Sequence, residues 1–236
     1  MTPILIVTRP DPQGAAFAAA IRQAWDGPLH IVLSPLLQIV PVHVGDDLSD
    51  LGGVIFTSVN GVAQAARLGL PKDLSAYCVG DKTAAAAAAA GFATKTGPGD
   101  AAQLTDMILA DRPTGPLAHI RGRHARGNIA GDLTDKGIFC RDVIAYDQQA
   151  LPMTEAAEHA LQGKKPVIVP LFSARTCTIF ESGGPFAAPL YLVAISAAAM
   201  TDQLAAVTRT IAAAPDGTAM IDATLGCLRE IVDRNG

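Results

Sequence analysis

The stretch VIFTSVNGV at residues 54–62 carries a short apolar run, a small polar turn and the start of a helix-like pattern. A second stretch, VIVPLFSAR at residues 167–175, runs in the same order. Each is followed by helix-like residues, another apolar run and a second small-residue turn, at residues 80–83 and 196–199. Ligands of open parallel sheets bind at the carboxyl ends of the strands. The duplication therefore predicts an α/β protein with two lobes that face one ligand.

The composition limits what kind of protein this can be. The chain has 236 residues, of which 50% are hydrophobic and 17% are charged, enough for one large domain or two small ones. Its net charge of −4 argues against general attraction to nucleic acid or anionic membranes. No apolar stretch has the length of a membrane span, and the N-terminal residues lack the basic region and cleavage site of a signal peptide. We therefore expect a cytoplasmic protein.

The cysteine and histidine residues give no sign of a cofactor site. The four cysteines are scattered without a C-x-x-C pair, and the five histidines lack metal-ligand spacing. We expect buried thiols, no disulfide framework, and no metal, haem or iron–sulfur cofactor.

The order of the apolar runs predicts two α/β lobes, one inserted into the other. Strands are expected near residues 4–7, 31–33, 53–57, 76–79, 117–121, 138–140, 166–172, 191–195 and 218–221, with helices near 13–25, 60–68, 82–91, 100–110 and 125–136. Residues 1–36 and 150–236 would form the first, discontinuous lobe, residues 43–142 the second, and residues 37–42 and 143–149 a two-stranded β connector. The alternative is a simple split into halves, which would leave the first half a surplus β-α-β unit and the second half short of strands. Each lobe is expected to hold a parallel sheet flanked by helices.

The first polar turn is a candidate anion site. Ser58, Asn60 and Gly61 follow an apolar strand and suit a turn into a helix. A helix N-terminus offers free backbone N–H groups and a partial positive charge, which favour carboxylate or phosphate. The alternative is a plain N-cap by Ser58 or Asn60. The equivalent position of Ser173 in the second stretch favours the binding interpretation.

The second turn, Gly80-Asp81-Lys82-Thr83, resembles the tail of a P-loop. It lacks the adjacent Gly and Lys and the earlier Gly that a P-loop needs. As a helix start it still offers N–H groups, a hydroxyl and an ammonium to an anion. The alternative is a capped Ala-rich helix with Lys82 in solvent.

The densest basic run, RGRHARG, begins at Arg121 and follows an apolar strand. Guanidinium groups match carboxylate and phosphate oxygens, so Arg121 is expected to bind an anion. Arg9 follows another strand and would place a cation at the mouth of the other lobe. The alternative for the basic run is a solvated turn that pairs with Asp132 or Asp135.

Tyr146 lies in the second connector stretch. A tyrosine there would face the ligand, where its hydroxyl could donate or accept a hydrogen bond and act as a weak acid. The alternative is an aromatic side chain packed on the connector.

Taken together, these segments resemble uroporphyrinogen-III synthases over nearly the whole chain. The resemblance begins with ILIVTRP at residues 4–10 and IFTSVNGV at 55–62. It continues with VGDKTA at 79–84, with the stretch from residue 137 to Tyr146, and with Phe172-Ser173. The order and spacing of these motifs carry the resemblance.

The resemblance implies a cofactor-free enzyme of tetrapyrrole (haem, cobalamin or chlorophyll-type) biosynthesis, with its active site in the cleft between the lobes. Its substrate would be hydroxymethylbilane, a linear tetrapyrrole with acetate and propionate side chains. The enzyme, a lyase, would help the terminal hydroxyl leave as water, invert the last pyrrole through a spiro intermediate and close the ring as uroporphyrinogen III. The family's contacts fall on Thr8, Ser58, Thr83 and Ser173, and Tyr146 would aid departure of the hydroxyl.

Few partners are expected beside this polycarboxylate substrate. We expect a monomer that receives hydroxymethylbilane by transient hand-over from the preceding enzyme of the pathway. Nucleic-acid and membrane partners are not expected.

The chain departs from the family at the turn after residue 195. The family usually has Ile-Gly followed by a Thr, whereas this chain has Ile195-Ser196-Ala197-Ala198-Ala199, so the expected Thr falls on Ala199. A hydroxyl contact is therefore lost or moved to Ser196. This departure keeps open an alternative function, a non-catalytic two-lobed protein that binds a tetrapyrrole or another anion as a regulator. A periplasmic-type solute receptor and a nucleotide enzyme are less favoured, because the signal peptide and the Walker and G-x-G-x-x-G motifs are absent.

Overall fold

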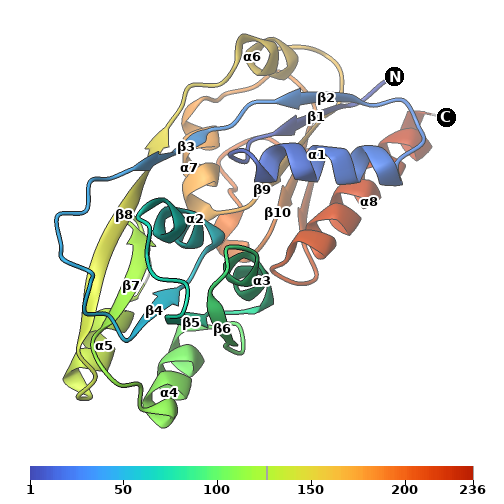
Figure 1. Cartoon of the computed structure of the whole chain (residues 1–236). Coiled ribbons are helices and arrows are strands. Elements are labelled where there is room, and N and C mark those ends of the chain that lie inside the picture. Colours follow the sequence, from blue (N-terminus) through green and yellow to red (C-terminus); the bar gives the residue numbers. More distant parts are fainter. Residues whose placement is uncertain (126, 236) are drawn as a thin grey trace. The chain divides into compact units, whose positions relative to one another are not determined.

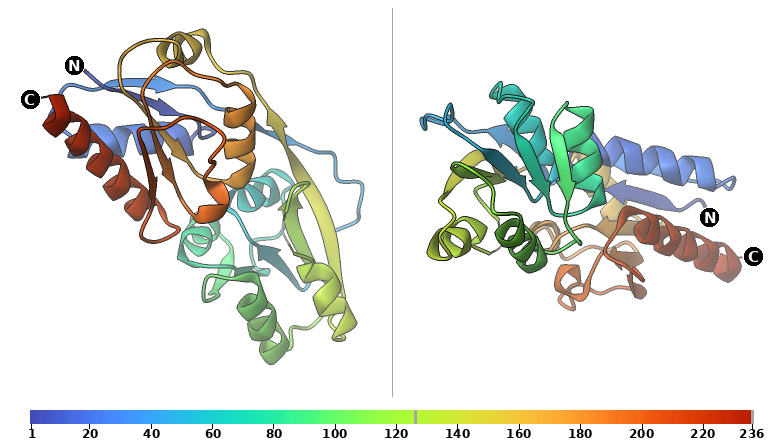
Figure 2. Two further views of the ribbon diagram at one scale, coloured as in Figure 1. Left: turned by 180° about the vertical axis from the view of Figure 1, so that it is seen from behind. Right: turned by 60° about the horizontal axis from the view of Figure 1, so that its bottom comes forward.

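The computed structural model of the protein describes residues 1–125 and 127–235 (Figure 1). It divides into two compact units, which we call unit 1 (Met1–Gln38 with Ala150–Gly236) and unit 2 (Ile39–Gln149). Each unit has a parallel sheet with helices on both faces, as Figure 2 shows, which confirms the predicted fold class. Among the described residues, the structure contains no helix that could span a membrane.

The sheet of unit 1 has five strands in the order β11-β10-β9-β1-β2, and its neighbouring strands run parallel. The strands are β1 (Ile4–Val7), β2 (His30–Leu33), β9 (Val167–Leu171), β10 (Leu190–Ala194) and β11 (Thr208–Ile211). The helices α1 (Gln13–Ala24) and α8 (Gly217–Asn235) cover one face, and α6 (Glu155–Leu161) and α7 (Ala174–Ser182) cover the other. A 3-10 turn, η1 (Ala197–Ala199), follows β10.

Two hydrophobic cores in unit 1 explain why β1 is apolar at every position. Leu5 and Val7 pack with α1 and α8, and Ile4 and Ile6 pack with α6 and α7. A parallel strand covered on both faces reads as a continuous apolar run, because successive side chains point to opposite faces.

The sheet of unit 2 has six strands in the order β3-β8-β7-β4-β5-β6. The strands are β3 (Leu37–Pro41), β4 (Gly53–Phe56), β5 (Ser75–Cys78), β6 (Ala93–Thr96), β7 (Leu117–Gly122) and β8 (Cys140–Ala150). The helices α2 (Val59–Arg67) and α3 (Asp81–Ala89) pack on one face, and α4 (Ala101–Asp111) and α5 (Ile129–Asp135) pack on the other. The strands β4, β5, β6, β7 and β8 run parallel, so their carboxyl ends share one edge. The predicted role of residues 37–42 and 143–149 as a connector between lobes stays a prediction.

One predicted element is wrong. Residues 218–221 were expected to form a strand but lie in α8, and the strand of this region is β11, ten residues earlier. The short apolar run at Met220 and Ile221 is one turn of a longer amphipathic pattern, in which Met220, Thr224, Cys227 and Ile231 are buried at helical spacing. β11 escaped prediction because it is a sheet-edge strand with the sequence TRTI, where polar residues outnumber apolar ones.

Candidate functional site

Ser58 and Tyr146, which are 88 positions apart in the sequence, meet at the carboxyl edge of the unit 2 sheet. Ser58 is the N-cap of α2, and its Oγ accepts a hydrogen bond from the Gly61 amide at 3.3 Å. The same Oγ lies 2.9 Å from the Tyr146 hydroxyl. The sequence predicted Ser58 and Tyr146 as separate site residues, and the structure joins them in one hydrogen-bonded pair.

Gly122 provides the room for Tyr146 to reach Ser58. β8 and β4 lie on either side of β7, so the Tyr146 ring must cross β7 to meet the turn after β4. A Cβ atom at Gly122 would lie 2.5 Å from the Cε2 atom of the Tyr146 ring. A register shift between Arg121 and Gly122 places Gly122 opposite Tyr146, and the Arg123 amide donates to the Tyr146 carbonyl at 2.9 Å. The ring position is thus determined by a glycine and a β-bulge.

The Tyr146 hydroxyl keeps its proton over the physiological range. The side chain is buried, and this burial raises its pKa from the ordinary value. The hydrogen bond with Ser58, the Gly122 backbone and the charge of Arg121 act in the opposite direction without reversing the shift. Tyr146 is therefore a neutral phenol that can donate a hydrogen bond or a proton.

Gly61 has a packing reason to be glycine. A Cβ atom at this position would lie 2.4 Å from the carbonyl oxygen of Ile120 in β7. The predicted binding residue Gly61 therefore permits the close approach of α2 to the sheet, and Asn60 occupies the first turn of the same helix.

The predicted second turn of unit 2 forms the start of α3. Gly80 is the N-cap and makes no side-chain cap, Thr83 is buried, and Lys82 is exposed. A hollow of about 500 Å³ lies beside it, lined by Gly80, Asp81 and residues 96–99. The Asp81 carboxylate on this hollow opposes an anion, while the α3 N-terminus favours one.

In unit 1, two predicted residues lie at the carboxyl end of β1. Thr8 is buried, and its hydroxyl donates to the Pro170 carbonyl at 3.1 Å, which ties β1 to β9. The Arg9 guanidinium lies over the Phe172 ring, 4.4 Å from its centroid. Burial lowers the pKa of Arg9, which nevertheless stays charged at neutral pH. Thr8 is therefore a structural tie, and Arg9 is a cation held in place by an aromatic face.

Ser173 and Ser196 start the two turns of unit 1. Ser173 is the N-cap of α7, accepts from the Thr176 amide at 3.1 Å and lies 2.9 Å from the Thr176 hydroxyl. Ser196 precedes η1, where its side chain makes no capping hydrogen bond. The first turn repeats the geometry of Ser58 and α2, whereas the second is a single 3-10 turn.

A protein-family model described as uroporphyrinogen-III synthase HemD matches residues 16–221. The chain belongs to the uroporphyrinogen-III synthase family. This membership confirms the predicted resemblance, shows that the chain is an enzyme, and supports the synthase interpretation over the regulatory alternative. A comparison with curated proteins found no significant match.

Two solved structures of this family support the fold. Uroporphyrinogen-III synthetase from Helicobacter pylori 26695 is 16% identical and has a TM-score of 0.69, with 96% of this chain and 100% of that chain covered. A mutant uroporphyrinogen III synthase from the extremely thermophilic bacterium Thermus thermophilus is 14% identical and has a TM-score of 0.54, with 99% of this chain and 100% of that chain covered.

The described charged side chains of the basic turn after β7 form ion pairs within the chain. Arg121 forms a two-pronged ion pair with Asp142 of β8, which raises the pKa of Arg121 and lowers that of Asp142. Arg123 and His124 both lie 3.3 Å from carboxylate oxygens of Asp147, also on β8. Arg126, part of the same basic run, lies outside the described residues.

These pairs change the interpretation of the basic turn. The predicted alternative partners, Asp132 and Asp135, are wrong for these side chains, because β8 runs alongside β7 and presents its own carboxylates to the turn. Arg121 was predicted as an anion ligand, but its guanidinium is already matched by a carboxylate. Its charge still acts on the neighbouring Tyr146 hydroxyl.

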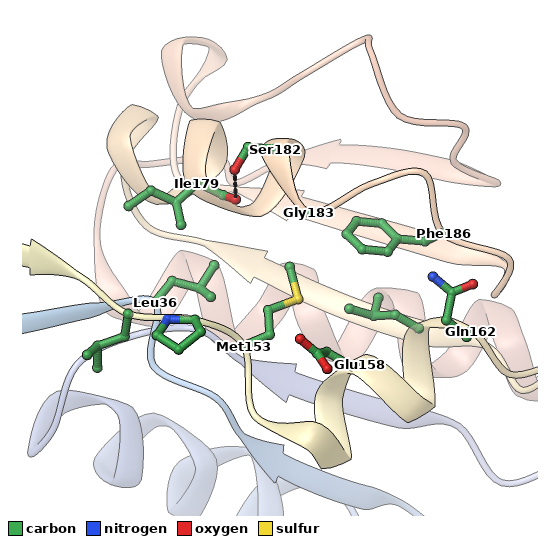
Figure 3. A pocket seen from close by; sticks show the side chains of 11 residues that line it. Leu36, Met153, Glu158, Gln162, Ile179, Ser182, Gly183 and Phe186 are labelled. Carbon is green, nitrogen blue, oxygen red and sulfur yellow. Dashed lines mark hydrogen bonds between the residues drawn. The ribbon is translucent and has the colours of Figure 1, made fainter.

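A cavity of about 450 Å³ in unit 1 is distinct from these residues (Figure 3). Its lining is mostly apolar, and its polar members are Glu158, Gln162 and Ser182. The Ser182 hydroxyl donates to the Ile179 carbonyl at 2.8 Å, and the Gln162 amide donates to the Pro185 carbonyl at 3.3 Å. The remaining polar group, a carboxylate, would repel a polycarboxylate, so this cavity does not suit the family's substrate.

One further pair near the site was not predicted. The imidazole Nε2 of His119 in β7 lies 3.1 Å from the hydroxyl of Thr57, which directly precedes Ser58. His119 is buried, and this burial lowers its pKa to about 4. The spacing of the histidines was compared only with that of metal ligands. A histidine inside the apolar run LAHI indicates a buried side chain that needs a hydrogen-bonding partner. Among the described residues, no group of three or more His, Cys, Asp or Glu side chains could hold a metal ion.

Substitution of Ser58 is expected to separate its two roles. Ser58→Ala removes an N-cap and should lower the free energy of unfolding by about 1 kcal/mol. It also removes the partner of the Tyr146 hydroxyl and should lower kcat about tenfold. Thr154→Ala removes a comparable N-cap from α6 and is the matched control, with a similar stability loss and unchanged kcat. Melting temperatures and initial rates of both variants test this, and equal kcat values for the two variants would contradict the second role.

Proposed function

We propose that this enzyme is a lyase that cyclises hydroxymethylbilane to uroporphyrinogen III, with inversion of the terminal pyrrole and loss of water. The observation that carries the proposal is the Ser58–Tyr146 pair at the carboxyl edge of a parallel sheet, in a chain of the uroporphyrinogen-III synthase family. A reaction that begins with departure of a hydroxyl needs a proton donor, and the Tyr146 phenol of this pair would be that donor.

The proton donated to the substrate comes from Tyr146 in this proposal. The Gly61 amide donates to one lone pair of the Ser58 oxygen, and in this proposal the Ser58 hydroxyl donates its own proton to the Tyr146 oxygen. The phenol proton of Tyr146 is then directed away from Ser58, toward the substrate. This order of donors also stabilises the phenolate that forms when the proton leaves.

The reaction balances without an added reactant. Tyr146 transfers its proton to the terminal hydroxyl, and the carbon–oxygen bond breaks. Water departs, and the carbon that carried it becomes a cation conjugated with its pyrrole. The substituted carbon of the last pyrrole attacks this cation to give the spiro intermediate. The bond between the spiro carbon and the bridging carbon of the neighbouring pyrrole then breaks and leaves a second cation on that bridging carbon. The unsubstituted ring carbon of the inverted pyrrole attacks this cation and closes the macrocycle. The proton lost from the ring carbon at closure restores the Tyr146 phenol.

In this proposal, hydrogen-bond donors and cationic side chains bind the carboxylates of the substrate. We propose as binding groups the N-termini of α2, α3 and α7, the side chains of Lys82 and Ser173, and the Arg9 guanidinium. Holding a flexible chain in one folded shape contributes to the rate by orientation. The proposal also takes the enzyme to be cytoplasmic and monomeric, with substrate received from the preceding enzyme.

The identity of the ring isomer tests the proposed function. Hydroxymethylbilane closes spontaneously to isomer I. Purified protein is incubated with freshly generated hydroxymethylbilane, the product is oxidised, and the isomers are separated by chromatography. We expect isomer III to dominate, whereas a product no richer in isomer III than a protein-free control would refute the proposed function.

A further inference from the structure

His119 and Thr57 lie on the opposite face of the unit 2 sheet from the Ser58–Tyr146 pair. In β7, Ala118 and Ile120 belong to the core with α2 and α3, and Leu117 belongs to the core with α4 and α5. Side chains alternate between the faces of a strand, so His119 shares the α4 and α5 face with Leu117. Ser58, by contrast, caps α2 on the other face.

The imidazole of His119 is a fixed hydrogen-bonding partner for Thr57. The His119 side chain is 3% exposed, so it cannot rotate into solvent. The nearby charges, Asp142 and Arg121, act on its protonation in opposite directions, and burial keeps it neutral. A neutral imidazole has one donor and one acceptor nitrogen, and its Nε2 lies 3.1 Å from the Thr57 hydroxyl.

We propose that His119 is a positioning residue, which holds the Thr57 side chain on one face of the sheet and thereby presents Ser58 to Tyr146 on the other. Thr57 and Ser58 are the two residues between β4 and α2, so fixing one side chain restricts the backbone that carries the next. The consequence for catalysis rests on the proposed function, because it acts through the Tyr146 hydroxyl. The effect of the His119–Thr57 contact on the Ser58–Tyr146 hydrogen bond, by contrast, does not depend on which reaction the protein catalyses.

The kinetic test removes the Thr57 hydroxyl without changing the shape of the side chain. Thr57→Val is expected to lower kcat for isomer III about fivefold with KM within about twofold of wild type. Thr57→Ser, which keeps the hydroxyl, should restore most of the loss. Thr105→Val removes another buried hydroxyl of unit 2, one that bonds to the Ala101 carbonyl within α4, and should leave kcat unchanged.

Combined substitutions distinguish positioning from general weakening of the fold. His119→Leu together with Thr57→Val should be no slower than the worse single variant, and Thr57→Val should cost nothing further in a Tyr146→Phe background. Losses that multiply in either combination, or a Thr57→Val kcat equal to wild type, would overturn the proposal.

A spectroscopic readout keeps this result separate from the proposed function. The chain has three tyrosines, and Tyr146→Phe assigns the Tyr146 signal in protein labelled with carbon-13 at the phenol carbon. We expect Thr57→Val and Ser58→Ala to shift that signal in the same direction, and Thr105→Val to leave it in place. If wild-type protein makes no isomer III but the shift occurs, the proposed function fails and the positioning role stands; an unmoved signal in Thr57→Val overturns the positioning role.

Discussion

Tyr146→Phe is expected to lower kcat for formation of isomer III by roughly tenfold to a hundredfold, with the fold retained. The ring of phenylalanine fills the same space over Gly122, whereas the donor at the end of the ring is lost. Because burial raises the pKa of Tyr146, loss of wild-type activity through Tyr146 ionisation should begin at a higher pH than for an exposed tyrosine.

Tyr191→Phe is the matched control for this result. Tyr191 is also buried, but it lies in β10 of unit 1 and outside the proposed catalytic pair. Initial rates and melting temperatures of the two variants, measured side by side, should differ in rate far more than in stability. Equal turnover by Tyr146→Phe and wild type would return Tyr146 to a packing role.

Gly61→Ala is expected to destabilise the fold clearly, although it adds only one methyl group. The new Cβ atom would lie 2.4 Å from the Ile120 carbonyl oxygen, and neither the helix nor the strand can move cheaply away. Overpacking of this kind costs about 1–3 kcal/mol and should lower the melting temperature by several degrees. Since α2 carries Ser58 at its N-terminus, a displaced helix should also lower kcat.

Gly226→Ala tests whether that effect is specific to position 61. Gly226 lies inside α8, and a Cβ atom there would meet no heavy atom within 4 Å. Alanine favours the helix over glycine by about 0.5–1 kcal/mol, so this variant should be as stable as wild type or more stable. If Gly61→Ala and Gly226→Ala had the same melting temperature, the packing of α2 would not depend on the close contact at Gly61.

The strands buried on both faces were the easiest elements to predict. β1, β4 and β9 consist of apolar residues and are completely buried, so a continuous apolar run identified them. β6 and β11 were missed because each is an edge strand with exposed positions that accept charged residues such as Lys95 and Arg209. The strand wrongly expected at residues 218–221 shows that a short apolar run cannot tell a strand from one turn of a helix.

The candidate site could be predicted by residue but not by contact. Ser58 and Tyr146 followed from turn chemistry, from position in the chain and from the family resemblance. Their contact depends on the strand order of the sheet and on a register shift beside Gly122, which no local pattern encodes. Arg121 was predicted to bind an anion, since nothing local to it shows that Asp142 on the next strand is its partner. His119 was missed because an isolated buried histidine has no recurrent spacing.

The isomer composition formed at early times by wild-type protein and by Tyr146→Phe, from the same batch of hydroxymethylbilane, tests the proposed reaction and its acid together. We expect the share of isomer III to rise with the concentration of wild-type protein, and equal amounts of Tyr146→Phe to leave most of the substrate to close as isomer I. Isomer I as the main product at every concentration of wild-type protein would contradict the proposed cyclisation with ring inversion.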